Sequence, residues 1–147
     1  MPGKLRAVIE EKGGKVHSIA PTATVVEAVD AMNAAGVGAL MVLDNDQPVG
    51  IISERDLLRR VVGKRLDPAA TSVADVMTRD LVVIKPDVDV EDAMAVVSEK
   101  RVRHLPVVED GKLTGVVSSG DLTRWASRDR DVQIKQLIDF ITGKYPS

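Results

Sequence analysis

The stretch that decides the fold is "GIISERD", residues 50–56, because the same outline returns as "GVVSSGD" at residues 115–121. Each stretch starts with glycine, continues through two β-branched residues and places a serine three positions before an aspartate. This spacing is typical of a capping box, in which the serine and the acidic side chain each bond the other's backbone amide. Both stretches therefore predict a strand that passes directly into a helix. The spacing alone leaves open whether the pair only starts that helix or also binds a ligand.

The likeness between the two stretches extends over most of the chain. Sliding the sequence on itself by 65 residues aligns the two halves without a gap, pairing Ile19 with Ile84, Pro21 with Pro86, Val42 with Val107, Gly50 with Gly115 and Asp56 with Asp121. Self-similarity at one fixed offset indicates two copies of one supersecondary unit. Two copies are too few for a solenoid, so we expect a closed pair related by a pseudo-twofold axis.

Each copy predicts the order strand, helix, strand, strand, helix. A short extended lead-in ends at a proline, an amphipathic helix follows, and two apolar strands are joined by the turns "NDQP" and "DGK". We place the copies at residues 16–63 and 79–126, between an N-terminal segment 1–15, a linker 64–78 and a C-terminal helical tail 127–147. The fold class is therefore α+β.

Several residues predict helix ends. Thr24 and Asp89 stand where N-caps of the first helices belong, and Gly63 stands where the second helix of copy one would end. Ser72 with Asp75 predicts a capping box for one short helical turn inside the linker.

The tail predicts one more helix, from about residue 129 to 143. Its apolar positions fall at helical spacing and are Val132, Leu137, Ile138 and Ile141. We expect this face to be buried against the body or against a second chain.

Composition excludes several classes of protein. The chain of 147 residues is 44% hydrophobic but has no apolar run near the roughly 20 residues needed to cross a bilayer. It lacks cysteine, which excludes disulfides and thiolate chemistry. A net charge of −2 and only three aromatic residues argue against nucleic-acid binding. The N-terminus has no apolar h-region of a secretory signal, and we expect a cytoplasmic protein.

Signatures of catalysis are also missing from the sequence. No serine lies in a nucleophile-elbow context, and only His17 and His104 could act as imidazole bases. There is no P-loop, no dinucleotide fingerprint and no His or Asp cluster with metal-ligand spacing. We therefore expect no catalytic residues and no metal.

The repeat resembles the CBS domain pair, or Bateman module. The resemblance is carried by "VGALMVLD" (37–44), "GIISERDLLR" (50–59), "VADVMT" (73–78) and "VRHLPVVEDGKLTGVVSSGDL" (102–122), and it covers about residues 16–126. It implies paired β-α-β-β-α units that bind an adenosine ligand in clefts between them: AMP, ADP or ATP, or else NAD(H) or S-adenosylmethionine. It further implies a non-catalytic sensor, a homodimer of pairs and an effector protein as partner.

The resemblance also implies roles for particular residues. Asp56 and Asp121 would accept hydrogen bonds from ribose hydroxyls, because carboxylate oxygens are acceptors only. Ser53 and Ser118 would cap the helix or donate to phosphate. Arg103 and His104 would meet phosphates, with Arg55 close enough to help. Copy one has Gly38 and Ala39 at the matching positions, so equal use of both clefts is in doubt.

By the same analogy each cleft joins one copy's strands to the other copy's Ser-x-x-Asp. One cleft would be lined by Ala23, Ala28, Val37, Gly38, Ser118 and Asp121. The other would be lined by Val88, Ala93, Val102, Arg103, Ser53 and Asp56, with Thr78 at its edge. We expect the cleft closed by "GVVSSGD" to be the surer binding site. Two alternatives stay open: a structural dimerisation module with degenerate clefts, and an enzyme acting on a nucleotide.

Overall fold

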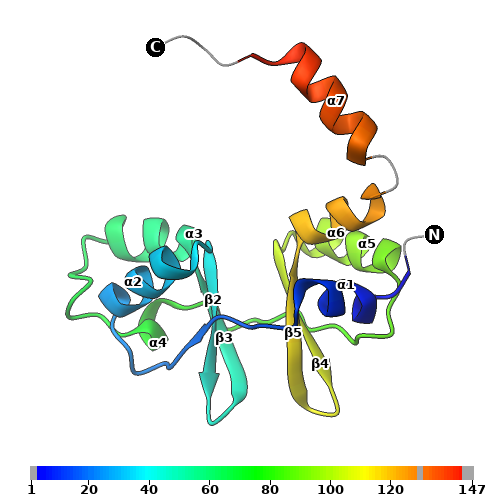
Figure 1. Ribbon diagram of the computed structural model, residues 1–147. Coiled ribbons are helices and arrows are strands. Elements are labelled where there is room, and N and C mark those ends of the chain that lie inside the picture. Colours follow the sequence, from blue (N-terminus) through cyan, green and yellow to red (C-terminus); the bar gives the residue numbers. More distant parts are fainter. Residues whose placement is uncertain (1–2, 129–130, 144–147) are drawn as a thin grey trace.

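The two repeats form two α/β halves whose sheets face each other, with the helices on the outer sides (Figure 1). The computed structural model describes residues 3–128 and 131–143. Repeat 1 consists of β1 (Ser18–Ile19), α2 (Val25–Ala35), β2 (Ala39–Asp44), β3 (Gln47–Ser53) and α3 (Glu54–Asp56), which continues as the π-helical η1 (Leu57–Val62). Repeat 2 consists of α5 (Val90–Lys100), β4 (His104–Glu109), β5 (Lys112–Ser118) and α6 (Ser119–Ala126). The predicted α+β fold class is confirmed.

The strand pairing repeats at the predicted offset. β1 is parallel to β2, β2 is antiparallel to β3, and β4 is antiparallel to β5. In repeat 2 the lead-in strand is reduced to one parallel bridge between Ile84 and Val107. Both hairpins shift register after the same position, Val42 in one and Val107 in the other. The bulge is therefore a property of the repeat.

The hairpin turns explain their residue choice. Asn45 and Asp46 have φ angles of 52° and 65°, and Asp110 and Gly111 have 52° and 77°. Two consecutive positive φ angles define the tight hairpin turn whose twist matches that of the strands, and Asn, Asp and Gly tolerate it best.

The predicted helix caps have mixed outcomes. The Thr24 side chain accepts from the amide of Glu27, which confirms it as an N-cap. Asp89 holds the N-cap position but makes no side-chain cap bond, because its carboxylate pairs with Lys4 at 3.1 Å. Ser72 precedes helix α4 (Val73–Val76) without capping it. Gly63 ends η1 with φ of −62°, so its freedom to adopt a left-handed conformation is not used.

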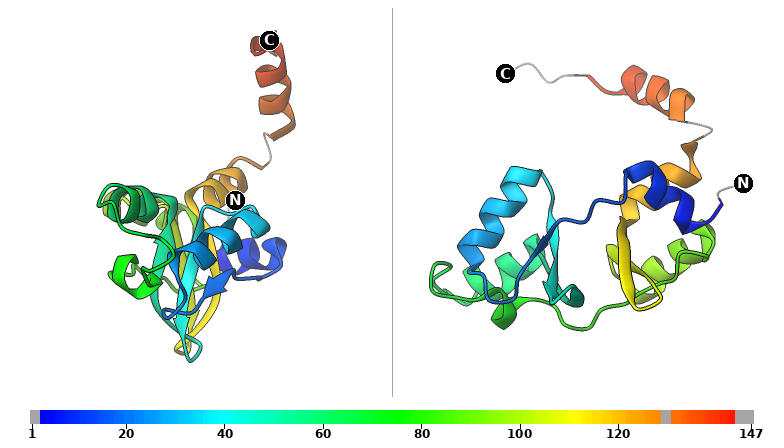
Figure 2. Two further views of the ribbon diagram at one scale, coloured as in Figure 1. Left: turned by 90° about the vertical axis from the view of Figure 1, so that its left-hand side faces the viewer. Right: turned by 60° about the horizontal axis from the view of Figure 1, so that its bottom comes forward.

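The two helices that precede the repeats exchange places. Helix α1 (Leu5–Lys12) precedes repeat 1 but packs on repeat 2, while α4 precedes repeat 2 and packs on repeat 1 (Figure 1). Figure 2 shows the chain crossing from one half to the other after each of these helices.

Backbone hydrogen bonds fix this exchange in the same way twice. The amide of Leu5 donates to the carbonyl of Val88 at 3.0 Å, and the amide of Val73 donates to the carbonyl of Ala23 at 2.8 Å. Val88 and Ala23 are equivalent positions of the two repeats. The amides of the next residues, Arg6 and Ala74, donate to the carbonyls of the equivalent prolines, Pro86 and Pro21.

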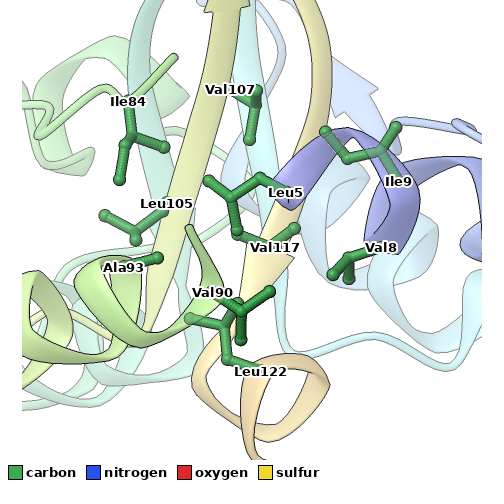
Figure 3. Close-up of a cluster of buried hydrophobic side chains, with 10 residues drawn as sticks. All are labelled: Leu5, Val8, Ile9, Ile84, Val90, Ala93, Leu105, Val107, Val117 and Leu122. Atoms are coloured by element: carbon green, nitrogen blue, oxygen red, sulfur yellow. The ribbon is translucent and has the colours of Figure 1, made fainter. Parts of the chain in front are cut away.

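Each half consequently has a core that includes a borrowed helix. Leu5, Val8 and Ile9 of α1 pack with the core of repeat 2, where Leu5 is surrounded by side chains from β4, β5 and α5 (Figure 3). Val73, Val76 and Met77 fill the corresponding place in repeat 1.

Gly50 and Gly115 are needed where the borrowed segments cross the strands. A Cβ atom on Gly50 would lie 2.6 Å from the sulfur of Met77 and 2.9 Å from the carbonyl oxygen of Thr78. A Cβ atom on Gly115 would lie 3.0 Å from the Ile9 side chain. The glycine that starts each quoted stretch therefore allows this close crossing.

The predicted tail helix is present as α7 (Asp131–Ile141). Residues 129–130 of the expected range lie outside the described residues, as does the side chain of Val132. Leu137, Ile138 and Ile141 are all exposed, so the expected burial of this face does not occur against the described part of the chain.

We expect Leu5→Ala to lower the free energy of unfolding by about 2–5 kcal/mol, because it leaves a cavity in the core of repeat 2. Urea denaturation measures the change. The same substitution at Leu137, which is 58% exposed, is the matched control and should stay within about 0.5 kcal/mol of wild type. Equal effects of the two substitutions would show that α1 does not contribute to the core.

Candidate functional site

Both Ser-x-x-Asp stretches form complete capping boxes. The backbone amides of Asp56 and Asp121 donate to the hydroxyls of Ser53 and Ser118 at 3.4 Å and 3.0 Å. The backbone amides of the two serines donate to the aspartate carboxylates, both at 2.9 Å. The cap interpretation of the spacing is therefore confirmed. Each box uses one carboxylate oxygen, Oδ2, which leaves Oδ1 to be accounted for.

In repeat 1, the Oδ1 atom of Asp56 is held from inside the protein. The hydroxyl of Thr78 donates to it at 2.9 Å, and the guanidinium of Arg60 lies 3.8 Å away. Asp56 is only 4% exposed. A ligand would have to displace the half-buried hydroxyl of Thr78 to reach this oxygen.

In repeat 2, Asp121 is held by two cations. The ammonium of Lys12 donates to Oδ2 at 2.7 Å and the guanidinium of Arg124 donates to Oδ1 at 2.8 Å. Burial alone would raise the pKa of Asp121, but the hydrogen bonds from Lys12 and Ser118 outweigh it and lower the pKa below its ordinary value. Because the Arg124 side chain is 71% exposed, replacing its contact with Oδ1 by a contact with another donor costs little free energy.

Two clefts lie between the repeats. Cleft A, next to Asp56, has a volume of about 330 Å³, and cleft B, next to Asp121, has about 350 Å³. Both volumes fall within the roughly 300–1,000 Å³ that is common for small-molecule sites. Of the sequence-predicted residues, cleft A is lined by Ser53, Arg55, Asp56, Thr78, Val102, Arg103, His104 and Gly38. Cleft B is lined by Val37, Gly38, His104, Ser118 and Asp121.

Four of the predicted lining residues lie elsewhere. Ala28 and Ala93 are fully buried on the inner faces of α2 and α5, where they pack into the two cores. Ala23 and Val88 also pack against the cores. Their carbonyls accept the hydrogen bonds that anchor α4 and α1. The structure therefore assigns these four positions to the framework and not to the clefts.

Arg103 and His104 are adjacent in the sequence but do not line the same clefts. Arg103 lines cleft A only, whereas His104 lines both clefts. Burial lowers the pKa of His104 and the nearby Lys12 ammonium lowers it further, against the opposing effect of Asp121. His104 is therefore a neutral imidazole at neutral pH, able to donate one hydrogen bond and accept another.

Two of the cleft residues that sequence reasoning missed, Lys12 and Lys15, come from the segment before the repeats. They line cleft B together with His17, at the start of repeat 1, and Arg124 of α6. The offset of 65 residues pairs Lys12 with no residue that predicts a role for it. Helix α1 precedes repeat 1 but packs on repeat 2, so the alignment of the repeats does not place it. Only the charged, glycine-containing stretch "KGGK" (12–15) marked the place in the sequence.

The two clefts differ in charge. The arginines of cleft A, Arg55, Arg101 and Arg103, are matched by the carboxylates of Glu54, Asp56 and Asp80. Cleft B has the cations Lys12, Lys15 and Arg124 against the single carboxylate of Asp121. Cleft B therefore favours an anionic ligand more strongly than cleft A.

Within residues 3–128 and 131–143, the structure holds no group of three or more His, Asp or Glu side chains placed to bind a metal ion. In that same part of the chain, no helix combines the length and apolarity required for a membrane span.

Comparison with known proteins identifies the family. The family model of the CBS domain matches residues 9–63 and again 73–128, so the chain belongs to the CBS domain family and contains a pair of these domains, which is a regulatory type of module.

Relatives and solved structures agree. The CBS domain-containing protein CBSX3, mitochondrial, of Arabidopsis thaliana is 35% identical over 127 residues, which are 83% of this chain and 62% of the plant protein. A crystal structure of a putative signal-transduction protein with CBS domains from Burkholderia ambifaria superposes with a TM-score of 0.82 at 33% identity, covering 86% of this chain and 96% of that one. A hexameric CBS-CP12 protein from bloom-forming cyanobacteria has a TM-score of 0.74 at 25% identity, covering 92% and 80%.

The lowered pKa of His104 predicts that acid destabilises the fold. Its ordinary pKa is about 6.5, and a lower value in the folded state means that the unfolded chain takes up the proton first. Stability should therefore fall as the pH drops below about 6.5. Thermal unfolding between pH 7.5 and 5.5 should show a loss that His104→Gln reduces and that His17→Gln, the matched control, retains. An equal loss in all three proteins would contradict the role of His104.

Proposed function

We propose that this CBS pair is a non-catalytic sensor that binds an adenine nucleotide of the AMP, ADP and ATP series in the clefts between its repeats. The observation that carries the proposal is the arrangement of cleft B. It places the Asp121 carboxylate at the start of α6, three cations beside it, and an aliphatic wall opposite.

The chemistry of cleft B fits the parts of a nucleotide. A ribose offers two adjacent hydroxyl donors, and the Asp121 carboxylate accepts them once Lys12 leaves Oδ2 and the exposed Arg124 leaves Oδ1. Phosphates are anions, which the cations of the cleft attract. The apolar residues that line cleft B include Val37, Met41 and Ile51. A planar base can pack against them without aromatic partners.

Regulation follows from the position of the clefts. Both repeats contribute to each cleft, so a bound ligand contacts both halves at once. A ligand shifts a conformational equilibrium only when it binds one arrangement better than another, and a cleft between two halves meets that condition. We expect the resulting change to be read by an effector protein.

We expect Asp121→Asn to weaken AMP or ATP binding by about 10- to 100-fold in isothermal titration calorimetry, since hydrogen bonds to a charged group contribute about 1.5–3 kcal/mol. Asp56→Asn alters the equivalent capping box and should have the smaller effect, because the Oδ1 atom of Asp56 is already held by Thr78. Asp92→Asn, on the exposed side of α5, is the control for the substitution itself.

Three outcomes would contradict the sensor proposal. Unchanged affinity in Asp121→Asn would remove the ribose role of that carboxylate. No thermal shift with AMP, ATP, NAD(H) or S-adenosylmethionine would favour a structural dimerisation module. Turnover of any of these compounds would favour an enzyme.

We also propose that the chain forms a homodimer through η1. Leu58 and Val62 lie one turn apart and are 65% and 67% exposed, whereas the equivalent positions of repeat 2 are the polar Thr123 and Ser127. The likeness to a hexameric CBS-CP12 protein supports assembly in general.

Val62→Asp should halve the mass measured by light scattering after gel filtration, because an unpaired charge would be buried in the interface. Ser127→Asp, at the equivalent position, should leave the mass unchanged. A wild-type protein that is already monomeric would overturn the proposal.

A further inference from the structure

We propose that Lys12, at the end of α1, and Lys15, on the turn that follows, form with Arg124 the phosphate subsite of cleft B, and that the Lys12 ammonium exchanges its contact with Asp121 for a phosphate when a nucleotide binds. Cleft B then selects phosphorylated nucleosides, with affinity rising with the number of phosphates. This inference rests on the proposed function, because it takes Asp121 as the acceptor of the ribose hydroxyls.

The Lys12 ammonium lies where a ligand would have to act. It donates to the Oδ2 atom of Asp121 at 2.7 Å and to the carbonyl oxygen of Val116 at 2.9 Å. Both acceptors belong to repeat 2 and line cleft B, as Lys12 itself does. The Lys12 side chain is 40% exposed, so its ammonium can reach solvent or a ligand without leaving a buried place. Lys12 therefore compensates the charge of Asp121 while the cleft holds no anion.

The turn that carries Lys12 suits a residue that changes partner. Gly13 and Gly14 follow it with φ angles of 91° and 67°, a left-handed conformation that favours glycine. A Cβ atom on Gly13 would meet nothing within 4 Å, so this glycine is not required by packing. Lys15 comes next and also lines cleft B. The two glycines therefore allow the left-handed backbone of this turn, and Lys12 and Lys15 stand on either side of them.

Cleft A provides the internal comparison. At the equivalent aspartate, Asp56, the hydroxyl of Thr78 donates to Oδ1 at 2.9 Å, whereas Lys12 donates to Oδ2 of Asp121. Thr78 carries no charge, and the arginines that line cleft A are equal in number to its carboxylates. A repeat therefore folds with an uncharged hydroxyl donating to its aspartate, whereas in cleft B a donor to the aspartate is a lysine ammonium.

Binding would exchange partners among these groups. The ribose hydroxyls take over Asp121, and the displaced ammonium of Lys12 moves to a phosphate oxygen, where the attraction between opposite charges is retained. A nucleoside without phosphate also displaces Lys12 but offers it no anion. Such a ligand loses an ion pair and gains none, so it binds more weakly.

The test is calorimetry of adenosine, AMP, ADP and ATP in Mg²⁺-free buffer at low, fixed salt, with wild type, Lys12→Met and Lys12→Arg. We expect Lys12→Met to lower the ratio of ATP to adenosine affinity by about 10- to 100-fold. Adenosine itself should bind Lys12→Met as well as wild type or better, because no ion pair has to be broken. Lys12→Arg should restore most of the ratio. Lys112→Met, at the exposed start of β5, is the matched control and should behave as wild type.

Inorganic tripolyphosphate separates the two proposals. If wild type binds it and Lys12→Met binds it at least about tenfold more weakly while no adenosine ligand binds, the phosphate subsite stands and the nucleotide function falls. If nucleotides bind wild type with an ATP to adenosine ratio that Lys12→Met does not change, the nucleotide function stands and the role of Lys12 is overturned. If neither nucleotides nor tripolyphosphate bind, both proposals fail. Circular dichroism of each variant confirms that the fold is intact.

Discussion

The exchange of α1 and α4 between the halves is the constraint on which the rest of the structure depends. Each repeat offers an uncovered apolar face beside its hairpin, and each is completed by the helix that precedes the other repeat. The equivalent hydrogen bonds to Ala23 and Val88 show that both halves receive their helix in the same way. Neither half can have its native core without the segment that leads into its partner. A chain of two small repeats thereby becomes one module.

The same exchange also supplies the chemistry of the clefts. Because α1 crosses to repeat 2, its last turn brings Lys12 onto Asp121, and because the segment after α4 crosses β3, Thr78 reaches Asp56. Gly50 and Gly115 permit these crossings, which explains why the quoted stretches begin with glycine. Two identical capping boxes thus end up with different neighbours. The asymmetry between the clefts thus comes from the segments before the repeats as well as from the repeats themselves.

The sequence predicted the parts of this protein that depend on short-range patterns. The offset of 65 residues anticipated the hairpins, the helices and both capping boxes, because strand periodicity, turn residues and Ser-x-x-Asp spacing are local. It did not anticipate the exchanged helices. From Leu5 to Ile19 the chain is three residues longer than from Val73 to Ile84, so the gapless alignment begins only after the helix it would have had to match. Lys12 therefore had no visible connection to Asp121, whereas Arg124 lies three residues after it on the same predicted helix, a spacing that allows the observed ion pair. Ala28 and Ala93 were predicted to line the clefts, but small residues on an amphipathic helix serve close packing equally well, and only burial distinguishes the two roles.

The relative strength of two contacts decides how far a ligand in cleft B could move the structure. Helix α1 is held by Leu5, Val8 and Ile9, and burial of one leucine of this kind is worth about 2–5 kcal/mol when it is truncated. The ion pair of Lys12 with Asp121 involves a side chain that is 40% exposed, and such pairs contribute at most about 1 kcal/mol after solvent screening. Exchange of Lys12 between carboxylate and phosphate is therefore far too weak to release α1 from repeat 2. The movement is confined to the end of the helix and the turn after it, residues 12–15, which lead directly into β1 of repeat 1. A ligand bound in cleft B would thus also act on repeat 1 through the connecting chain, while both cores stay intact.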